Sequence, residues 1–382
     1  MSEEHLPGPE QYAPEVLAVG PFPPFVGGAA KNTAIICDAL EVRGAKVTRL
    51  STNRTRSRAE HSRSLGFLAE RTVGFMANLR RIFFGRSNAG PVTAYLVPDG
   101  GLGVAFSVAY ARIAASKCSR LVIHHRSYNH LRHRSRLMAM LMKTSPTRTI
   151  HVFLDPVMEQ RFKETYRTEV RSTFVPNAAT CDVTPDPGTV ESGEQGRLTV
   201  GFLSNLVEEK GFDVVAEAFP LLAERLGPQS RFVLAGRPVG ARNEARLTEL
   251  RQRLGDRLMY LGEVAGEKKT EFFRTCDVFV FPTRFPQEAQ PNVLYEALAG
   301  GAAIVSTRWA GVPWVLEGTT SRIIEAGADR CHDLVGAVSD IVDSGELAQA
   351  REHQIAAFAV KKADADSRYS QLIEILLGST VT

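Results

Sequence analysis

The sequence predicts an α/β protein built from two doubly wound domains, and three observations support this fold class. Apolar runs of strand length alternate with segments of helical spacing along most of the chain. The alternation begins twice, at 15–20 and at 197–203, and a stretch rich in Pro, Gly and acids at 181–196 separates the two series. The chain has 382 residues, more than one hydrophobic core usually supports.

The composition argues against disulfide-rich, zinc-binding, secreted and membrane-spanning classes of protein. The chain is 44% hydrophobic and 23% charged, which is typical of globular proteins. Five scattered cysteines without a CxxC pair argue against a disulfide framework or a zinc site and fit a reducing compartment. The N-terminal MSEEHLPGPE does not resemble a signal peptide, and no apolar run reaches the roughly 18 residues that a membrane span needs. We therefore expect a cytoplasmic protein.

The net charge of +4 conceals a difference between the two halves. Residues 1–176 carry 25 Lys and Arg against 13 Asp and Glu, whereas the remainder carries 21 against 29. A basic first half and an acidic second half suggest a different partner for each.

The first series starts with a strand at 15–20, a loop containing Gly27 and Gly28, and a helix at 31–44. A glycine-rich loop before a helix lets the backbone approach a ligand and favours anions, although such a loop is more often only a tight turn. A further strand leads into GLG at 101–103. Because Phe106 stands where a dinucleotide fingerprint has its third glycine, we reject a nicotinamide site.

The segment 120–131 reads as a strand that runs into a loop, and it carries three polar residues in succession. His124, His125 and Arg126 lie at the carboxyl end of this strand, where parallel sheets bind their ligands. A histidine there is often only a structural hydrogen-bonding residue. Which of the three points inward is left open at this point.

The second series places Lys210 beside Gly211 in its first loop, and Arg237 after a strand at 231–236. The tail, about 350–378, is predicted to be helical. Its Asp364 and Asp366 would point to nearly opposite sides of a helix, so we assign no metal site.

The unit at 277–318 reads as strand, loop, helix and strand, with Pro291 at the first helical position. Glu288 lies in the loop and Glu296 in the helix. From Pro291 to Glu296 the helix axis rises only about 7–8 Å, so the two carboxylates could hold two ends of one elongated ligand at the helix N-terminus. The alternative is a loop acid near a positive helix end and a solvated helix glutamate.

The segment FPTRFPQEAQPNVLYEALAGGAAIVSTRWAGVP resembles the glutamate–seven residues–glutamate region of family 4 glycosyltransferases, which are retaining enzymes with the two-domain GT-B fold. It departs from the usual pattern at Ala289-Gln290, where Gly-Phe is common, and at Trp314, where another glutamate is usual. The resemblance covers about 200–317 strongly and the first half loosely. It implies Rossmann-like domains at 1–176 and 177–355 that face across a cleft, and a helix at 356–382 that packs back on the first domain.

The resemblance also implies roles for individual residues. Glu288 would contact the donor sugar, Glu296 the nucleotide ribose, and Lys210 the donor diphosphate. The arginine that accompanies this lysine in the family is replaced by Asn205, so Arg237 is a candidate for the missing charge. The remaining candidates are His125 near the donor sugar, Gly27 and Gly28 facing the acceptor and phosphates, and the backbone N–H groups of the segment Ala289, Gln290, Pro291 and Asn292 around the sugar hydroxyls.

The function implied is metal-independent transfer of a sugar from a nucleotide-sugar donor to a glycan or lipid-linked acceptor, in cell-surface polysaccharide or glycoconjugate synthesis, without a cofactor. One alternative is a sugar-nucleotide epimerase of the same fold, which has no acceptor. The other is a nucleic-acid-binding protein, suggested by the basic half. The chain lacks the basic–aromatic pattern of known modules and its second half is acidic, so we expect no nucleic-acid partner.

Two basic apolar segments suggest a membrane surface as a partner. A helical stripe at 65–84 combines four phenylalanines with Arg80 and Arg81, and arginines precede LMAMLM at 137–142. Basic amphipathic helices lie on anionic membranes, which would place the protein peripherally at the inner face. The alternative is that both stripes pack on the first domain's sheet. For 137–142 we favour packing on the sheet, and for 65–84 both packing and membrane contact remain open.

Overall fold

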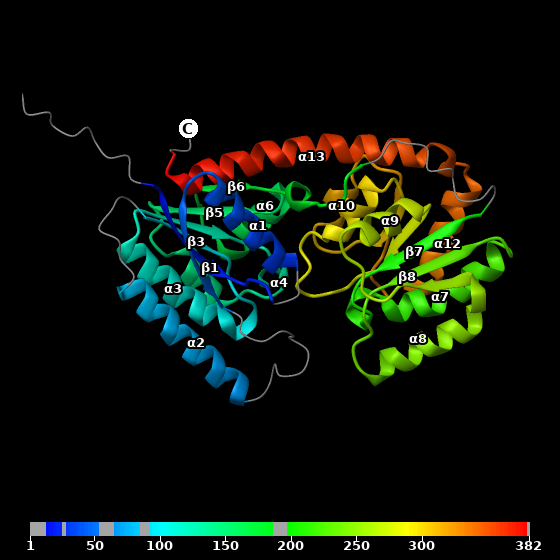
Figure 1. The fold of residues 1–382 in the computed structure, drawn as a ribbon, viewed down its shortest axis with the longest axis horizontal. Coiled ribbons are helices and arrows are strands. Elements are labelled where there is room, and N and C mark those ends of the chain that lie inside the picture. The colour runs from blue at the N-terminus through cyan, green and yellow to red at the C-terminus, as the bar shows by residue number, and fades with distance from the viewer. Residues whose placement is uncertain (1–12, 25–27, 53–64, 85–91, 186–196, 380–382) are drawn as a thin grey trace, which may run out of the picture.

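The structure is a computed structural model that describes residues 13–24, 28–52, 65–84, 92–185 and 197–379. Two α/β domains lie side by side, and the longest helix, α13 (Leu347–Leu377), runs along both of them (Figure 1). The alternation of strands and helices that the sequence predicts is therefore present in both halves.

The first domain contains a six-stranded parallel sheet in the order β2-β1-β3-β4-β5-β6. Its order reverses direction between β1 and β3, the position where doubly wound sheets bind ligands at their carboxyl ends. The strands are β1 (Glu15–Gly20), β2 (Lys46–Ser51), β3 (Val92–Leu96), β4 (Arg120–His124), β5 (Thr149–Phe153) and β6 (Ser172–Phe174). The helices are α1 (Gly28–Val42), α2 (Leu65–Phe84), α3 (Val104–Lys117), α4 (Asn129–Arg132), α5 (Arg136–Met142) and α6 (Pro156–Tyr166), with 3₁₀ turns η1 (Gly101–Gly103) and η2 (Asn177–Thr180).

The second domain contains another six-stranded parallel sheet, in the order β12-β11-β10-β7-β8-β9, which reverses between β7 and β10. The strands are β7 (Thr199–Leu203), β8 (Arg231–Ala235), β9 (Leu258–Tyr260), β10 (Val278–Phe281), β11 (Ala303–Thr307) and β12 (Ser321–Ile324). The helices are α7 (Phe212–Arg225), α8 (Ala241–Leu254), α9 (Glu267–Thr275), α10 (Asn292–Ala299), α11 (Val312–Leu316) and α12 (Arg330–Asp343), with turns η3 (Glu208–Lys210) and η4 (Gly255–Arg257). Helices cover both faces of each sheet, which explains why β5, β10 and β11 are buried at every position.

The strand–helix–strand unit predicted at 277–307 is present as β10, α10 and β11. Pro291 precedes the helix as its N-cap instead of occupying its first turn, because its backbone is extended (φ −66°, ψ 120°). The segment 137–142 falls in α5, where Met138, Leu141 and Met142 are buried in the first domain's core. For that segment the packing alternative is confirmed.

Helix α13 contributes to the cores of both domains. Near its start, Gln354 is fully buried and donates from Nε2 to Ala302 O and Thr320 O, both at 2.9 Å. At its end, Leu372 and Leu376 lie in one apolar cluster with residues of β1 and β3. Arg120 on β4 donates to the carbonyl of Ile375 at 2.5 Å, which satisfies a terminal carbonyl of the helix. A domain boundary at 356 therefore falls inside one continuous helix.

Replacing Leu376 by alanine tests the contribution of α13 to the first domain. The side chain is fully buried, so its loss should cost about 2–5 kcal/mol of unfolding free energy. Val360→Ala on the exposed face of the same helix is the matched control, because Val360 is 73% exposed. Thermal melting, together with amide exchange in β1 and β3, measures the effect. Equal melting of the two variants would contradict a role for the helix end in the core.

Candidate functional site

Two loops at the reversal point of the second sheet bring Lys210 and Glu288 together. β7 leads into η3, which ends at Lys210, and β10 leads into the loop that carries Glu288. Lys210 Nζ donates to Glu288 Oε2 in an ion pair. The side chains keep 21% and 13% exposure, so the pair is partly buried and still in contact with solvent. Two residues predicted separately from the sequence thus form one unit.

Gly211 allows this approach of the two loops. Its φ is +91°, and a Cβ atom there would lie 2.5 Å from the carbonyl oxygen of Pro282. Both the positive φ and the close backbone contact require glycine. Any other residue would push the loop of Lys210 away from the loop of Glu288.

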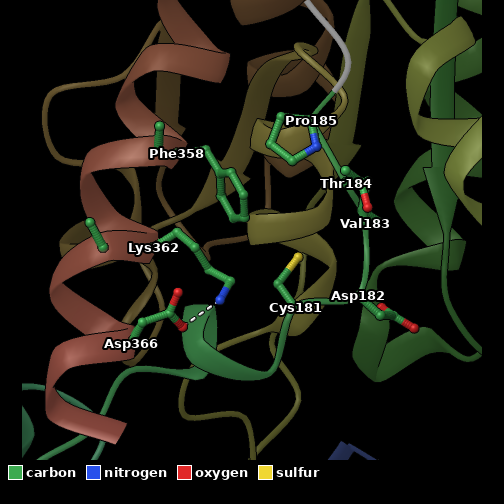
Figure 2. A pocket seen from close by; sticks show the side chains of 10 residues that line it. Cys181, Asp182, Val183, Thr184, Pro185, Phe358, Lys362 and Asp366 are labelled. Atoms are coloured by element: carbon green, nitrogen blue, oxygen red, sulfur yellow. Dashed lines mark hydrogen bonds and ion pairs between the residues drawn. The ribbon is translucent and has the colours of Figure 1, made fainter. Parts of the chain in front are cut away.

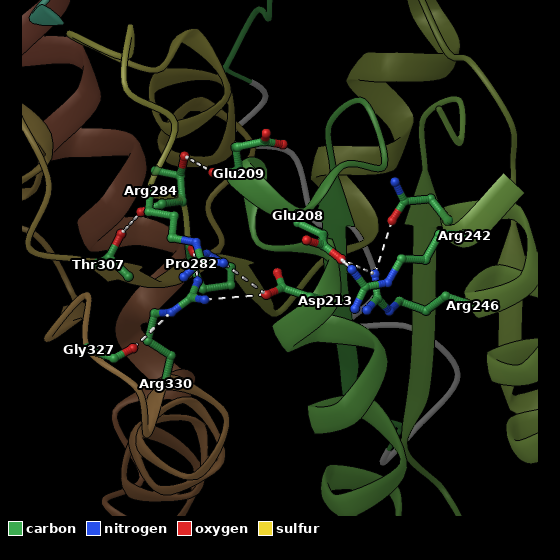
Figure 3. A network of polar contacts seen from close by, with 12 residues as sticks. Glu208, Glu209, Asp213, Arg242, Arg246, Pro282, Arg284, Thr307, Gly327 and Arg330 are labelled. Atoms are coloured by element: carbon green, nitrogen blue, oxygen red, sulfur yellow. Dashed lines mark hydrogen bonds and ion pairs between the residues drawn. The ribbon is translucent and has the colours of Figure 1, made fainter. Parts of the chain in front are cut away.

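The buried side chain of Arg330 holds the same two loops together. Arg330, at the start of α12, donates to Pro282 O at 3.1 Å and contacts Asp213 Oδ2 at 3.4 Å (Figure 3). The backbone N–H of Arg284 donates to Glu209 O at 2.8 Å. The loop after β10 is therefore tied both to η3 and to the first turn of α7. Sequence reasoning missed Arg330, because nothing in its local pattern distinguishes it from a surface arginine.

Glu296 is buried in the structure. It is 2% exposed, and its Oε1 accepts a hydrogen bond from Lys269 Nζ at 2.5 Å. The alternative of a solvated helix glutamate is therefore wrong. Burial raises the pKa of the Glu296 carboxyl, and the charge of Lys269 opposes that rise. Lys269 was not a candidate, because it is one of several charged residues in an amphipathic helix.

Ala289 and Gln290 join the two domains. Ala289 packs into the core of the first domain. Gln290 donates from Nε2 to Leu154 O at 2.8 Å and to Asp155 Oδ2 at 3.0 Å, and its Oε1 accepts from the N–H of Asn177 at 3.1 Å. The structure uses their side chains at the junction, because the loop before α10 presses against the first domain. The expectation that the backbone N–H groups of this segment bind the donor sugar stays a prediction.

Two aromatic residues of the second domain contact the same junction. The guanidinium of Arg132 lies 3.4 Å from the ring centroid of Trp309. Trp314 meets Phe174 of β6 edge-on, with centroids 6.5 Å apart. The departures from the family pattern at 289–290 and 314 therefore coincide with contacts between the domains.

The starts of α1 and α10 face each other across the junction. A Cβ atom on Gly28 would lie 3.5 Å from Asn292 Nδ2, and Asn292 Nδ2 is 3.5 Å from Asn32 Oδ1. Within the described residues, the N–H groups of Gln290 and Asn292 donate to no backbone carbonyl. Free N–H groups at a helix start favour an anion or a hydroxyl oxygen. Gly27 lies outside the described residues.

Of His124, His125 and Arg126 at the carboxyl end of β4, Arg126 is the one that reaches the domain junction. It donates from Nη2 to Asn177 Oδ1 at 2.8 Å. The His124 ring pairs with the Tyr95 hydroxyl at 2.9 Å, and His125 Nε2 pairs with His151 Nδ1 at 2.9 Å. Burial lowers the pKa of both histidines well below the ordinary value. We expected His125 beside the donor sugar, but its ring is turned into the first domain's core.

Asn205 and Arg237 are exposed neighbours at the ends of β7 and β8. The N–H of Leu206 donates to Arg237 O at 2.9 Å, which places the two loops side by side. Within the part of the chain that the structure describes, no three His, Cys, Asp or Glu side chains gather as metal ligands would. None of the described helices is long and apolar enough to cross a bilayer.

Comparisons with known proteins agree with this geometry. Residues 197–344 match the family model described as Glycosyl transferases group 1. The phosphatidylinositol N-acetylglucosaminyltransferase gpi3 subunit of Schizosaccharomyces pombe is 28% identical over 177 residues, which is 45% of this chain and 37% of that relative. The chain therefore spans little more than a third of that curated relative.

Solved structures resemble the whole chain. WaaG, a glycosyltransferase involved in lipopolysaccharide biosynthesis, has a TM-score of 0.65 at 16% identity, covering 96% of this chain and 100% of that one. HepE from Anabaena, in complex with UDP-glucose, has a TM-score of 0.63 at 14% identity, covering 95% and 100%. These likenesses confirm the two-domain GT-B fold that the resemblance implied.

Removing the Gln290 side chain tests the junction. Gln290→Ala leaves the buried N–H of Asn177 without its acceptor and removes one donor from Asp155 Oδ2, at a cost of about 1–3 kcal/mol for an unsatisfied group. Amide exchange at Asn177 should accelerate accordingly. The control is Gln160→Ala, which removes an exposed glutamine that bonds only within α6. Unchanged protection of Asn177 would show that Gln290 does not hold the domains together.

Proposed function

We propose, from the match of residues 197–344 to the family model of the glycosyl transferases group 1, that this protein transfers a sugar from a nucleotide-sugar donor to an acceptor hydroxyl. The observation that carries the proposal is the Lys210–Glu288 pair. It lies inside the matched residues, at the point where the strand order reverses and beside the start of α10. A cation, a carboxylate and free helix N–H groups then meet where this class of sheet binds ligands.

In this proposal the donor separates the Lys210–Glu288 pair. Lys210 moves onto the diphosphate and stabilises the negative charge that develops as the bond to the anomeric carbon breaks. Glu288 accepts hydrogen bonds from sugar hydroxyls, and the N–H groups of Gln290 and Asn292 bind the remaining oxygens. Until the donor arrives, each charge of the pair compensates the other in a partly buried site.

The nucleotide part of the donor extends toward Glu296, whose carboxylate accepts from the ribose hydroxyls. Arg237 supplies a second cation on the phosphate side, next to Asn205. The structure of HepE with UDP-glucose makes UDP-sugars the first donors to test. The proposed reaction retains configuration at the anomeric carbon and uses no metal ion, because Lys210 and the α10 N-terminus supply the positive charge.

We propose a lipid-linked glycan or glycoconjugate as the acceptor, bound on the first domain. The names of two similar proteins support this class: one acts on phosphatidylinositol and one in lipopolysaccharide biosynthesis. The excess of basic residues in 1–176 suits an acceptor that carries phosphate groups.

A screen of UDP-, GDP- and ADP-sugars by thermal stabilisation tests the proposal. A ligand at 100 times its Kd adds about 2.7 kcal/mol to the stability of the folded state. Incubation of the stabilising donor without acceptor then separates the alternatives, because an epimerase would convert the donor alone into an isomer. Failure of every nucleotide-sugar to stabilise the protein would contradict the proposed function.

Substitutions at the ion pair should separate binding from turnover. Lys210→Met removes a charged hydrogen-bond donor worth about 1.5–3 kcal/mol, so donor KM should rise roughly 10- to 150-fold. Glu288→Gln should mainly lower kcat, because contacts to the sugar strengthen in the transition state. Steady-state kinetics measure both. Lys268→Met, an exposed lysine of the same domain, is the control and should behave as wild type. Wild-type kinetics in both site variants would refute the assignment of the pair.

We further propose that α2 contacts an anionic membrane surface. Phe75 and Leu79 pack against the first domain's core, so one face of the stripe is structural. The other face exposes Val73 by 60% and Met76 by 56%, next to exposed Arg80. Exposed apolar side chains beside arginines on one helix face suit the headgroup region of a bilayer.

Co-sedimentation with liposomes tests this surface. Binding should require anionic lipid and decrease with salt. Arg80→Glu/Arg81→Glu should weaken binding roughly 30-fold or more, since two surface cations contribute about 2 kcal/mol. The control Arg251→Glu/Arg253→Glu makes the same charge change on α8 of the other domain. Equal recovery in the supernatant with and without anionic vesicles would contradict a membrane contact.

A further inference from the structure

Glu296 is one end of a chain of alternating charges that reaches the first domain. Its Oε1 lies 2.5 Å from Lys269 Nζ, and Lys269 Nζ lies 3.2 Å from Asp182 Oδ1. Asp182 Oδ2 in turn lies 2.7 Å from Lys31 Nζ. The four residues come from α10, α9, the segment between the domains, and α1. The chain therefore links the proposed ribose site to both domains.

Burial increases steeply along this chain. The side chains of Lys31 and Asp182 are 38% and 46% exposed, Lys269 is 15% exposed, and Glu296 is 3% exposed. A carboxylate taken out of water is costly unless a cation accompanies it, and otherwise it binds a proton. Among the described residues, Lys269 is the cation that contacts Glu296. The charge of Glu296 thus depends on Lys269.

Of the other charged groups around Glu296, Lys31 also acts to lower the pKa of its carboxyl, whereas Asp182 acts to raise it. Burial acts to raise the pKa of Asp182, but Lys31 and Lys269 outweigh it and lower that pKa to about 2. Burial acts to lower the pKa of Lys269, and the Glu296 and Asp182 carboxylates reverse this and raise it. Burial, together with the charge of Glu296, raises the pKa of the neighbouring Cys181 thiol to about 12. Asp182 and Lys269 are therefore charged at neutral pH, and Cys181 is neutral.

The orientation of the connecting segment permits this arrangement. Figure 2 shows Cys181 to Pro185 running opposite α13 along a pocket, with the Asp182 carboxylate pointing away from α13. On that side it meets Lys31 and Lys269. No described group donates to the second oxygen of Glu296, Oε2, which leaves its lone pairs available for hydroxyl donors.

We propose that Lys269 is a positioning residue for donor binding: it holds Glu296 ionised and oriented through Oε1, so that Oε2 accepts the ribose hydroxyls. Asp182 and Lys31 link this pair to the connecting segment and to α1. This inference rests on the proposed function, since it takes Glu296 as the ribose ligand.

The pH dependence of nucleotide affinity tests the inference, with UDP as the probe and titration calorimetry as the measurement. Binding requires ionised Glu296, so below its pKa the affinity should fall about tenfold per pH unit. In Lys269→Met the buried carboxylate loses its cation, and the midpoint of this fall should move to higher pH. Lys269→Arg, which keeps the charge, should stay near the wild-type midpoint. The titration of the UDP phosphate affects all variants equally, so it does not move the midpoint of one variant relative to another.

A merely structural salt bridge gives a different result. If Lys269→Met weakens UDP binding equally at every pH, or not at all, the inference is overturned while the proposed function stands. Glu296→Gln should abolish the Glu296 component of the pH dependence, and Lys269→Met added to Glu296→Gln should cause little further loss. If Lys269→Met reduces the UDP affinity as much in the Glu296→Gln protein as it does in the protein that keeps Glu296, the inference is also overturned.

Melting temperatures provide a measurement that does not depend on the ligand. In Lys269→Met the folded-state pKa of Glu296 is raised, so stability is present at low pH and is lost as the pH rises through that pKa. The deficit in melting temperature relative to wild type should therefore grow with pH, and should lose this pH dependence in Lys269→Met/Glu296→Gln.

If Lys269→Met does not fold, recovery of folding in the double variant supports the pairing of Lys269 with Glu296, and continued failure overturns it. If wild type binds none of UDP, GDP and ADP, the proposed function fails, and the melting series still decides the pairing.

Discussion

The reversal of strand order between β7 and β10 is the constraint on which the candidate site depends. Because these two strands are neighbours, the loops that follow them emerge at the same edge of the sheet. One loop carries Lys210, and the other carries Glu288 and continues into α10. The close backbone contact at Gly211 and the buried guanidinium of Arg330 then fix the distance between the loops. The strand order therefore determines where the site lies, and the side chains on the two loops then determine its chemistry.

The fold could be predicted from the sequence because its signals are local. Apolar runs mark the buried strands, and the glycines at 300–301 mark the end of α10. Glu288 could be identified as a candidate from its place in a loop before a helix, and Lys210 from the resemblance to the family. Their direct contact could not be predicted, because it depends on two loops 78 residues apart in the chain.

The errors of the sequence analysis share one physical cause. Whether a side chain faces a ligand, a second domain or a core depends on elements that local patterns do not contain. His125 follows a strand at the expected edge, yet aromatic rings of β5 and α6 surround it. The side chain of Gln290 forms hydrogen bonds between the domains, which its local sequence does not indicate. Glu296 could not be recognised as buried, because its cation comes from α9.

Helix α13 has a consequence for the order in which the protein is completed. The apolar cluster that contains residues of β1 and β3 also includes Leu372, Ile373, Ile375 and Leu376, which lie at the end of α13 and follow the second domain in the chain. When residues 1–176 have been synthesised, part of the hydrophobic core of the first domain is therefore still missing. Domains generally fold as they emerge, N-terminal first, but the core of this one is complete only after the second domain and α13 have been synthesised. The first domain therefore depends on a segment that follows the second domain in the chain.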